Sequence, residues 1–268
     1  MSTTRLHNGT VKMKTPSGKA HYGFDAPGVM RGLLAGGLGG LVLGIAAALL
    51  ATGWLRAAGV GLAAVAGVPL ILGLSMVVYG LIGKQRMRDH MLGLIDWRGD
   101  ERVLDIGTGR GLLLIGAAKR LGRGGQATGI DIWRAEDLTD NSLDRLAENV
   151  GAERVENAVT LLTADARKLP FPDASFDVVL SLYCIHNIEG RADQDAALAE
   201  IVRVLKPGGR ALIGEWLPTH RYAGVFRTAG LTVRGSRTHF ATALTLMWLV
   251  DAEKPALITQ PERKRAHV

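Results

Sequence analysis

The stretch "VLDIGTGRG", Val103–Gly111, places three glycines within five positions directly behind an apolar, β-favouring run. Glycines in such a cluster permit a tight turn and let the backbone approach a ligand closely. The dinucleotide-binding pattern G-x-G-x-x-G would need its third glycine one place later, where this chain has Leu112. The chain also lacks the G-K-S or G-K-T of a phosphate-binding P-loop. The loop therefore predicts a ligand that is neither a dinucleotide nor ATP.

Strand-like and helix-like segments alternate around this loop, from about Lys84 onward. The predicted strands cover residues 102–107, 126–132, 158–165, 176–185, 210–216, 231–237 and 243–252. The predicted helices cover residues 111–121, 141–150, 193–205 and 222–230. Alternation of this kind, with nearly continuous apolar strands, predicts an α/β fold whose parallel sheet is covered by helices on both faces.

An acidic residue follows the second predicted strand, at the place where open α/β sheets bind their ligands. This residue is Asp131, twenty positions after Gly111. A carboxylate there can accept hydrogen bonds from both hydroxyls of a ribose. The glycine loop and this acid together predict a cofactor that contains a nucleoside.

Four motifs, "VLDIGTGRG", "GIDI", "TADARKLPFPDASFDVVLS" and "RVLKPGG", occur in this order along the chain. They resemble the glycine loop, ribose motif, adenine motif and later strand motif of class I S-adenosylmethionine-dependent methyltransferases. The run "LPFPDASFDVV" with "EIVRVLKPGG" is similar to the subgroup that includes quinone, sterol and small-molecule methyltransferases. The resemblance covers about Arg88–Pro255. It implies a Rossmann-like, seven-stranded sheet whose last strand is antiparallel, and residues 243–252 fit that strand.

The resemblance also implies a set of cofactor-binding residues, which are Asp105, Gly107, Gly109, Gly111, Asp131, Ile132, Asp165, Ala166 and Ser181. Gly107 and Gly109 would approach the methionine part of S-adenosylmethionine, and Asp105 would help to hold its amino group. A turn or loop cap is the alternative role of Asp105.

Two positions of this set would bind the ribose and two would bind the adenine edge. Asp131 would hold the ribose hydroxyls, with Ile132 packing on the base. Asp165 would accept from the adenine amine while the backbone N–H of Ala166 meets a ring nitrogen. The alternative for both acids is an ordinary surface carboxylate at a strand end.

The segment "SLYCIHNIEG" after the fourth predicted strand carries the candidate groups for the methyl acceptor. His186 is the candidate acid or base, its alternative being a cap of the strand-to-helix corner, and Tyr183 and Asn187 are candidate substrate contacts. Related methyltransferases often carry a histidine pair here, so Asn187 is a departure. The single cysteine, Cys184, lies among apolar neighbours and predicts a buried, inert thiol. No motif indicates a metal site.

Two uncharged apolar segments, residues 32–55 and 57–82, precede this domain. Each exceeds the roughly 20 residues needed to cross a bilayer core. The first segment could instead be a cleaved signal peptide, but about thirty residues precede it. The two segments could also form a buried hairpin of a soluble protein, but such helices usually have a polar stripe and these have none. We therefore expect a basic flexible arm over residues 1–31, a transmembrane hairpin over 32–83, the methyltransferase domain over 84–255 and a disordered basic tail over 256–268.

Small residues recur every fourth position in both apolar segments, at Gly32, Gly36, Gly40, Gly44 and Ala48 and at Gly59, Ala63 and Gly67. Such faces let helices approach closely, which predicts a packed hairpin and allows self-association. Basic residues flank the pair, and the short connection holds only Arg56. The positive-inside rule then predicts an integral membrane protein with both termini and the catalytic domain in the cytoplasm.

The net charge of +7 allows nucleic acid or anionic lipid as a partner, but the basic residues concentrate beside the apolar segments and in the tail. We therefore expect a membrane and a small hydrophobic or lipid-like substrate as partners, and no nucleic acid.

Four apolar residues that follow the second apolar segment are expected to cover the active site, namely Met87, Met91, Leu92 and Ile95. The alternative is a non-catalytic membrane-bound sensor or scaffold that binds the cofactor. An aminopropyltransferase would need a pair of carboxylates for its polyamine, and the segment "SLYCIHNIEG" has no such pair. We expect the domain from about Arg86 onward to bind the cofactor alone.

Overall fold

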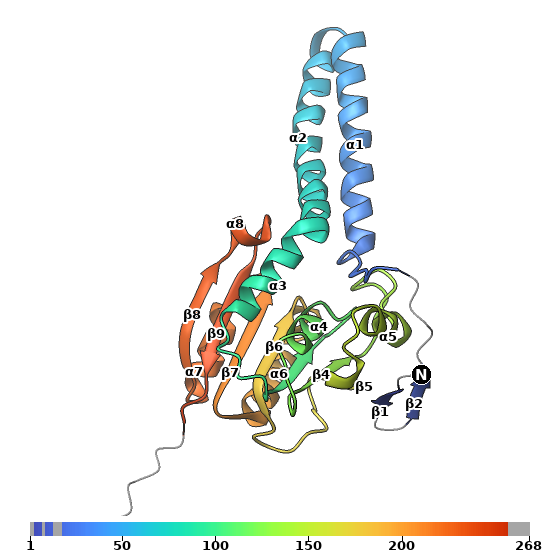
Figure 1. The fold of residues 1–268 in the computed structure, drawn as a ribbon. Helices are drawn as coiled ribbons and strands as arrows, with labels where there is room; N and C mark the ends of the chain where they lie inside the picture. The colour runs from blue at the N-terminus through green and yellow to red at the C-terminus, as the bar shows by residue number, and fades with distance from the viewer. Residues whose placement is uncertain (1–2, 7–8, 13–17, 257–268) are drawn as a thin grey trace, which may run out of the picture.

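A computed structural model describes residues 3–6, 9–12 and 18–256, and it has two parts (Figure 1). A helical hairpin, α1 and α2, projects from a domain built on one large sheet. Residues 257–268, which hold nearly all of the predicted basic tail, lie outside the described residues. Two short strands near the N-terminus, β1 (Thr3–Leu6) and β2 (Gly9–Lys12), pair antiparallel with each other.

The hairpin consists of α1 (Pro27–Leu50) and α2 (Gly53–Val78), joined by two residues. Both helices are long and apolar enough to cross a membrane, and only 11% of the apolar window of each is buried. Large side chains such as Val42, Leu43 and Leu72 are about half exposed or more. A helix in the core of a soluble protein would bury such residues.

The hairpin interface uses some of the predicted small residues and not others. A Cβ atom on Gly44 would lie 2.5 Å from the backbone nitrogen of Ala63, and one on Gly40 would lie 2.8 Å from the Cβ of Ala66. Gly32, Gly36 and Gly67 have no atoms within 4 Å of that position, so their predicted place in the contact is wrong. Successive contacting residues on each helix are alternately three and four positions apart, whereas the prediction placed them four apart throughout. The contacting residues are Gly37, Gly40 and Gly44 on α1 and Gly59, Ala63, Ala66, Leu70 and Gly73 on α2. An average of 3.5 residues keeps two crossing helices in contact, whereas a strict four-residue step drifts around the helix.

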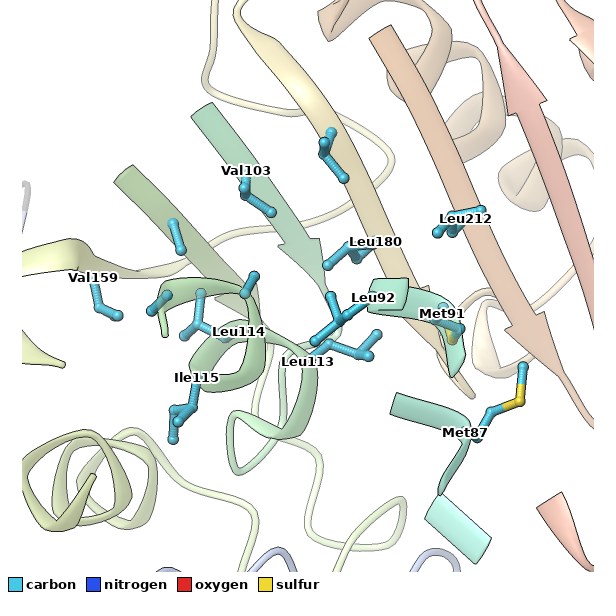
Figure 2. Close-up of a cluster of buried hydrophobic side chains, with 14 of the residues drawn as sticks. Met87, Met91, Leu92, Val103, Leu113, Leu114, Ile115, Val159, Leu180 and Leu212 are labelled. Carbon is cyan, nitrogen blue, oxygen red and sulfur yellow. The ribbon is translucent and has the colours of Figure 1, made fainter. Parts of the chain in front are cut away.

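The second helix of the hairpin continues into the domain without a break in the chain's helical path. A π-helical turn, η1 (Tyr79–Gly83), joins α2 to α3 (Lys84–Gly93). Met87, Met91 and Leu92 on α3 are fully buried. They pack in the core beside β6, β7 and α4 (Figure 2) and line neither of the two cavities at the glycine loop, so the structure does not place them over the candidate site as expected.

The seven strands of the sheet have the order β5-β4-β3-β6-β7-β9-β8. They are β3 (Arg102–Ile106), β4 (Gln126–Asp131), β5 (Val159–Thr163), β6 (Phe176–Leu182), β7 (Leu205–Glu215), β8 (Thr232–Thr238) and β9 (Trp248–Glu253). Strands β3 to β7 are parallel, and β9 runs antiparallel between β7 and β8. The predicted Rossmann-like sheet with an antiparallel last strand is therefore confirmed.

Helices cover both faces of this sheet. They are α4 (Leu112–Ala118), α5 (Leu143–Ala152), α6 (Arg191–Val204), α7 (His220–Thr228) and α8 (Phe240–Ala243), with short 3-10 turns η2 (Glu156–Ala158) and η3 (Ile185–Asn187). Side chains of α3, α4 and α5 form one buried cluster with Val103 and Leu180, and those of α6 and α7 form another with Leu104 and Val179. Neighbouring strand residues point to opposite faces, which explains why these strands are apolar throughout.

Several segments differ from their predictions: β6 ends at Leu182 rather than at residue 185, and β7 begins at Leu205 rather than at residue 210. The final strand begins at Trp248 rather than at residue 243, because α8 precedes it and Leu244 has a left-handed backbone with φ 58°. The predicted flexible arm also includes residues that are bonded to the domain. The backbone N–H of His21 donates to Asn149 Oδ1 at 3.0 Å, and that of Ala26 donates to the carbonyl of Asp137 at 2.8 Å.

Candidate functional site

The glycine loop turns sharply between β3 and α4. Gly107 and Gly109 both have positive φ angles, 68° and 50°. A Cβ on Gly107 would overlap the side chain of Cys184, and one on Gly109 would lie 2.8 Å from Leu138. Both the backbone conformation and the space therefore require glycine. Gly111 caps α4, and its Cβ position is filled by Leu146, so Gly111 serves packing and not the cavity.

Asp131 ends β4 beside this loop and is held on both oxygens. Its Oδ2 accepts from the N–H of Gly109 at 2.8 Å, and its Oδ1 accepts from the N–H of Trp133 at 2.7 Å. A carboxylate has about four acceptor positions, so each oxygen keeps one for a further donor. This rigid carboxylate can accept from two neighbouring hydroxyls.

A cavity of about 270 Å³ opens beyond the carboxyl ends of β3, β4 and β5. The predicted residues that line it are Gly107, Gly109, Asp131, Ile132, Asp165, Ala166 and Asn187. The predicted residues that do not line it are Asp105, Gly111, Ser181, Tyr183 and His186. Leu138, Arg167 and Asp25 also line the cavity, and none of these was among the predicted site residues.

Asp165 meets an arginine that the sequence analysis missed. Arg167 donates to Asp165 from its backbone N–H at 2.9 Å and from its guanidinium at 2.7 to 3.1 Å. These hydrogen bonds hold the pKa of Asp165 below its usual range, so the carboxylate is anionic at neutral pH. Arg167 is two positions after Asp165 in the motif "TADAR", which is the signal that points to it.

Asp105 is buried under the glycine loop. Its Oδ2 accepts from Thr108 Oγ1 at 2.8 Å and from the N–H of Leu114, in the first turn of α4, at 3.0 Å. It therefore caps this helix, the alternative role considered for it. Burial raises its pKa to about 7, against the hydrogen bonds from Thr108 and Leu114. Asp105 also lines a second, smaller cavity of about 50 Å³ on the other side of the loop.

His186 pairs with a buried acid at the end of β7. Its Nδ1 lies 2.5 Å from Glu215 Oε2, and its N–H donates to Glu215 Oε1 at 3.2 Å. Glu215 is fully buried, and the imidazole packs edge-on against Tyr183 and Trp216 with ring centroids 6.1 and 5.9 Å apart. A carboxylate beside Nδ1 favours a proton on that nitrogen and leaves Nε2 to exchange one. Glu215 was missed, although its position at a strand end was available in "IGEW".

Two further predicted residues lie near this pair. Cys184 lines the cavity, and burial, followed by the neighbouring carboxylate of Asp131, raises the pKa of its thiol. The thiol is therefore neutral at pH 7, in keeping with the inert role expected of it. Ser181 is fully buried in β6, and its Oγ has no hydrogen-bond partner among residues 18–256.

The groups that line the main cavity fit a purine nucleoside with a cationic substituent. Asp131 and Asp165 supply acceptors for hydroxyls and an amine, and Ile132, which is 54% exposed, offers an apolar face for a base. The two glycines leave a cradle that any Cβ would fill. The lining holds more carboxyl groups than guanidinium groups, Asp25, Asp131, Asp137, Asp165 and Glu189 against Arg134 and Arg167, and this balance favours a cation over a phosphate.

Comparison with known proteins indicates a methyltransferase domain. Residues 104–213 match the family model of a methyltransferase domain. The chain is 34% identical over 140 residues to a 27-O-demethylrifamycin SV methyltransferase of Amycolatopsis mediterranei, covering 52% of this chain and 47% of the relative. It is 37% identical over 145 residues to the ubiquinone/menaquinone biosynthesis C-methyltransferase UbiE of Chromobacterium violaceum, covering 52% and 54%. The chain thus spans about half the length of these curated relatives.

Solved structures share the fold at low sequence identity. A SAM-dependent methyltransferase from Aquifex aeolicus has a TM-score of 0.52 and 20% identity, covering 63% of this chain and 90% of that one. The matched region of the family model runs from β3 to β7 and contains the strand ends that surround the main cavity.

Proposed function

We propose that this chain, which carries an S-adenosylmethionine-dependent methyltransferase domain, is a membrane-anchored enzyme that methylates a small hydrophobic or lipid-like acceptor. The observation that carries the proposal is the cavity where the glycine loop, Asp131 and Asp165 meet. The methyltransferase activity rests on the family match. The anchor rests on the apolar hairpin, and the acceptor class rests on the aromatic side chains beside His186.

The cavity residues have separate roles toward the cofactor. Asp131 accepts from the ribose hydroxyls, Ile132 and Ala166 contact the adenine, and Asp165, fixed by Arg167, accepts from its amine. When bound, S-adenosylmethionine supplies a methyl group activated by positive charge. The protein therefore contributes mainly alignment of the acceptor with that group.

His186 and Glu215 supply proton transfer for an acceptor that carries a proton at neutral pH. Glu215 orients the imidazole through Nδ1, and Nε2 takes the proton from the acceptor atom. Asn187, which lines the cavity on the same turn, is placed to contact the acceptor. His186 does not line the cavity. The acceptor would therefore lie between the imidazole of His186 and the cavity.

The hairpin supports the membrane part of the proposal. Its exposed apolar surface needs a hydrocarbon environment, and basic residues flank both helices while only Arg56 lies near the connection. We infer that both termini and the domain lie in the cytoplasm. Gly32, Gly36 and Gly39 face away from α2 and offer a close-approach surface for a second copy, which cross-linking in membranes would test.

Aromatic side chains link the base of the hairpin to the histidine. The rings of Tyr79, on η1, and Tyr183 have centroids 5.1 Å apart, and Tyr183 in turn packs on His186. Trp216, beside His186, is half exposed. Of these rings Trp216 is the exposed one, so an acceptor that leaves the bilayer beside α2 would contact it, which supports a hydrophobic substrate. One curated relative is named for 27-O-demethylrifamycin SV and the other for ubiquinone/menaquinone biosynthesis.

The test is methyl transfer by the full-length protein in lipid nanodiscs. We expect radiolabel from S-adenosylmethionine to appear in a lipid extract of the source cells, and His186→Ala to reduce the rate while cofactor affinity stays unchanged. Cofactor binding without any transfer would support the sensor instead. Purification from the cytosol without detergent would contradict the anchor.

A further inference from the structure

The small cavity at the glycine loop is lined in part by residues that precede the matched methyltransferase region. Its walls include Tyr22 and Asp25 from the N-terminal segment and Tyr79 and Lys84 from the end of the hairpin, with Asp105 below. Asp25 lines the main cavity as well. The two cavities therefore adjoin at Asp25 and the glycine loop, and the end of the hairpin contributes Tyr79 to the small one.

Lys84 is a buried cation in this cavity. Its side chain is only 3% exposed, and Nζ donates to Asp25 Oδ2 at 3.1 Å and to the carbonyl of Tyr22 at 3.0 Å. An ammonium group has three donors, so one remains without a protein partner among the described residues. A buried charge is costly to leave incompletely paired, which indicates a site with a use for a further acceptor.

Asp25 is held beside Lys84 with one oxygen uncommitted. Oδ2 meets Lys84, whereas Oδ1 makes no hydrogen bond within the part of the chain that the structure describes. The backbone around it is fixed by a β-bridge to Leu138 and by the bond from Ala26 to Asp137. Its carboxylate is 29% exposed and borders the cavity space.

The N-terminal segment and the hairpin end are interlocked, so these two side chains are positioned together. The ring of Phe24 fills the space where a Cβ on Gly80 would lie. Gly80 belongs to the π-helical turn, an arrangement that is frequent at functional sites. The turn adds a residue to the helical repeat just before Lys84, which changes the direction in which α3 presents its side chains.

We propose that Asp25 and Lys84 form a zwitterion-binding pair for the amino-acid end of the cofactor. Asp25 accepts from the α-ammonium group, and Lys84 donates to the α-carboxylate. The pair borders the Gly107 side of the loop, where the methionine part is expected, and its opposite charges match those of an amino acid. This inference rests on the proposed function, and it brings the N-terminal segment and the first residue of α3, directly after the hairpin, into the cofactor site.

The experiment compares two ligands that differ only at that end, using the full chain in nanodiscs. S-adenosylhomocysteine has the amino-acid group, and 5′-methylthioadenosine keeps the nucleoside and the sulfur but lacks it. We expect Lys84→Met and Asp25→Asn each to weaken S-adenosylhomocysteine about tenfold or more and to change methylthioadenosine affinity less than about twofold. Lys119→Met, which removes an exposed lysine paired with Glu153, is the matched control and should change neither.

Two other results would contradict the proposal. Equal weakening of both ligands would mean that the pair only supports the fold, and unchanged S-adenosylhomocysteine affinity would remove the pair from the site. Should Lys84→Met fail to fold, the isosteric Asp25→Asn at a partly exposed position carries the same comparison. If the parent protein bound neither ligand, the proposed function itself would fail, which is a separate result.

Discussion

Replacing Asp105 with asparagine tests how much the buried carboxyl under the glycine loop destabilises the fold. Asp105 is 2% exposed, and both of its hydrogen bonds, from Thr108 and Leu114, arrive at one oxygen. An asparagine carbonyl can accept both, so Asp105→Asn keeps the cap of α4 and removes only the charge. The substitution should therefore stabilise the folded protein.

The size of the effect follows from the pKa of Asp105, which burial raises from 3.8 to about 7. A raised pKa means that the folded state binds the proton more tightly than the unfolded state. The carboxyl costs nothing below about pH 4, destabilises the fold increasingly between pH 4 and 7, and costs a constant amount above pH 7. At 1.36 kcal/mol per tenfold change, the full cost is about 4 kcal/mol, and burial of the amide reduces the net gain to about 2–4 kcal/mol.

The assay is thermal unfolding followed by tryptophan fluorescence in nanodiscs at pH 5.5 and pH 8. We expect Asp105→Asn to raise the Tm by about 4–12 °C at pH 8 and by clearly less at pH 5.5. Asp173→Asn, at a side chain that is 79% exposed, is the control and should give no such gain. A variant less stable than the parent at pH 8, or a gain independent of pH, would refute the reasoning.

Three further predictions concern the ribose contact, the proton-transfer pair and the hairpin. Asp131→Asn should weaken S-adenosylhomocysteine by about 5–100-fold in calorimetry, because a charged acceptor becomes neutral, and unchanged affinity would remove Asp131 from the site. Glu215→Gln should lower the rate of methyl transfer and shift its pH profile without changing cofactor affinity, and an unaltered profile would exclude the orienting role. Gly44→Ile should separate α1 from α2 and abolish cross-linking between cysteines placed across the hairpin, whereas Gly39→Ile, with no atom within 4 Å, should not.

The fold class and several residues that line the main cavity could be predicted because their signals are local. The loop at Gly107 and Gly109, the acid at Asp131 and the alternation of apolar strands each lie within a short stretch of chain. Backbone conformation and side-chain alternation are properties of neighbouring residues, so the sequence determined them directly. The predicted adenine-site residues Asp165 and Ala166 also line the cavity for this reason.

Pairings between distant residues could not be read in the same way. Glu215 lies 29 positions from His186 and meets it only because β7 pairs beside β6. Asp25 and Lys84 are 59 positions apart, and a hairpin of two helices brings them together. Which glycines face each other in that hairpin depends on how the helices cross, a choice made by packing of both surfaces at once. The sequence determined the local chemistry of each segment, and only the tertiary structure decided which segments share a site, because those contacts arise from long-range packing.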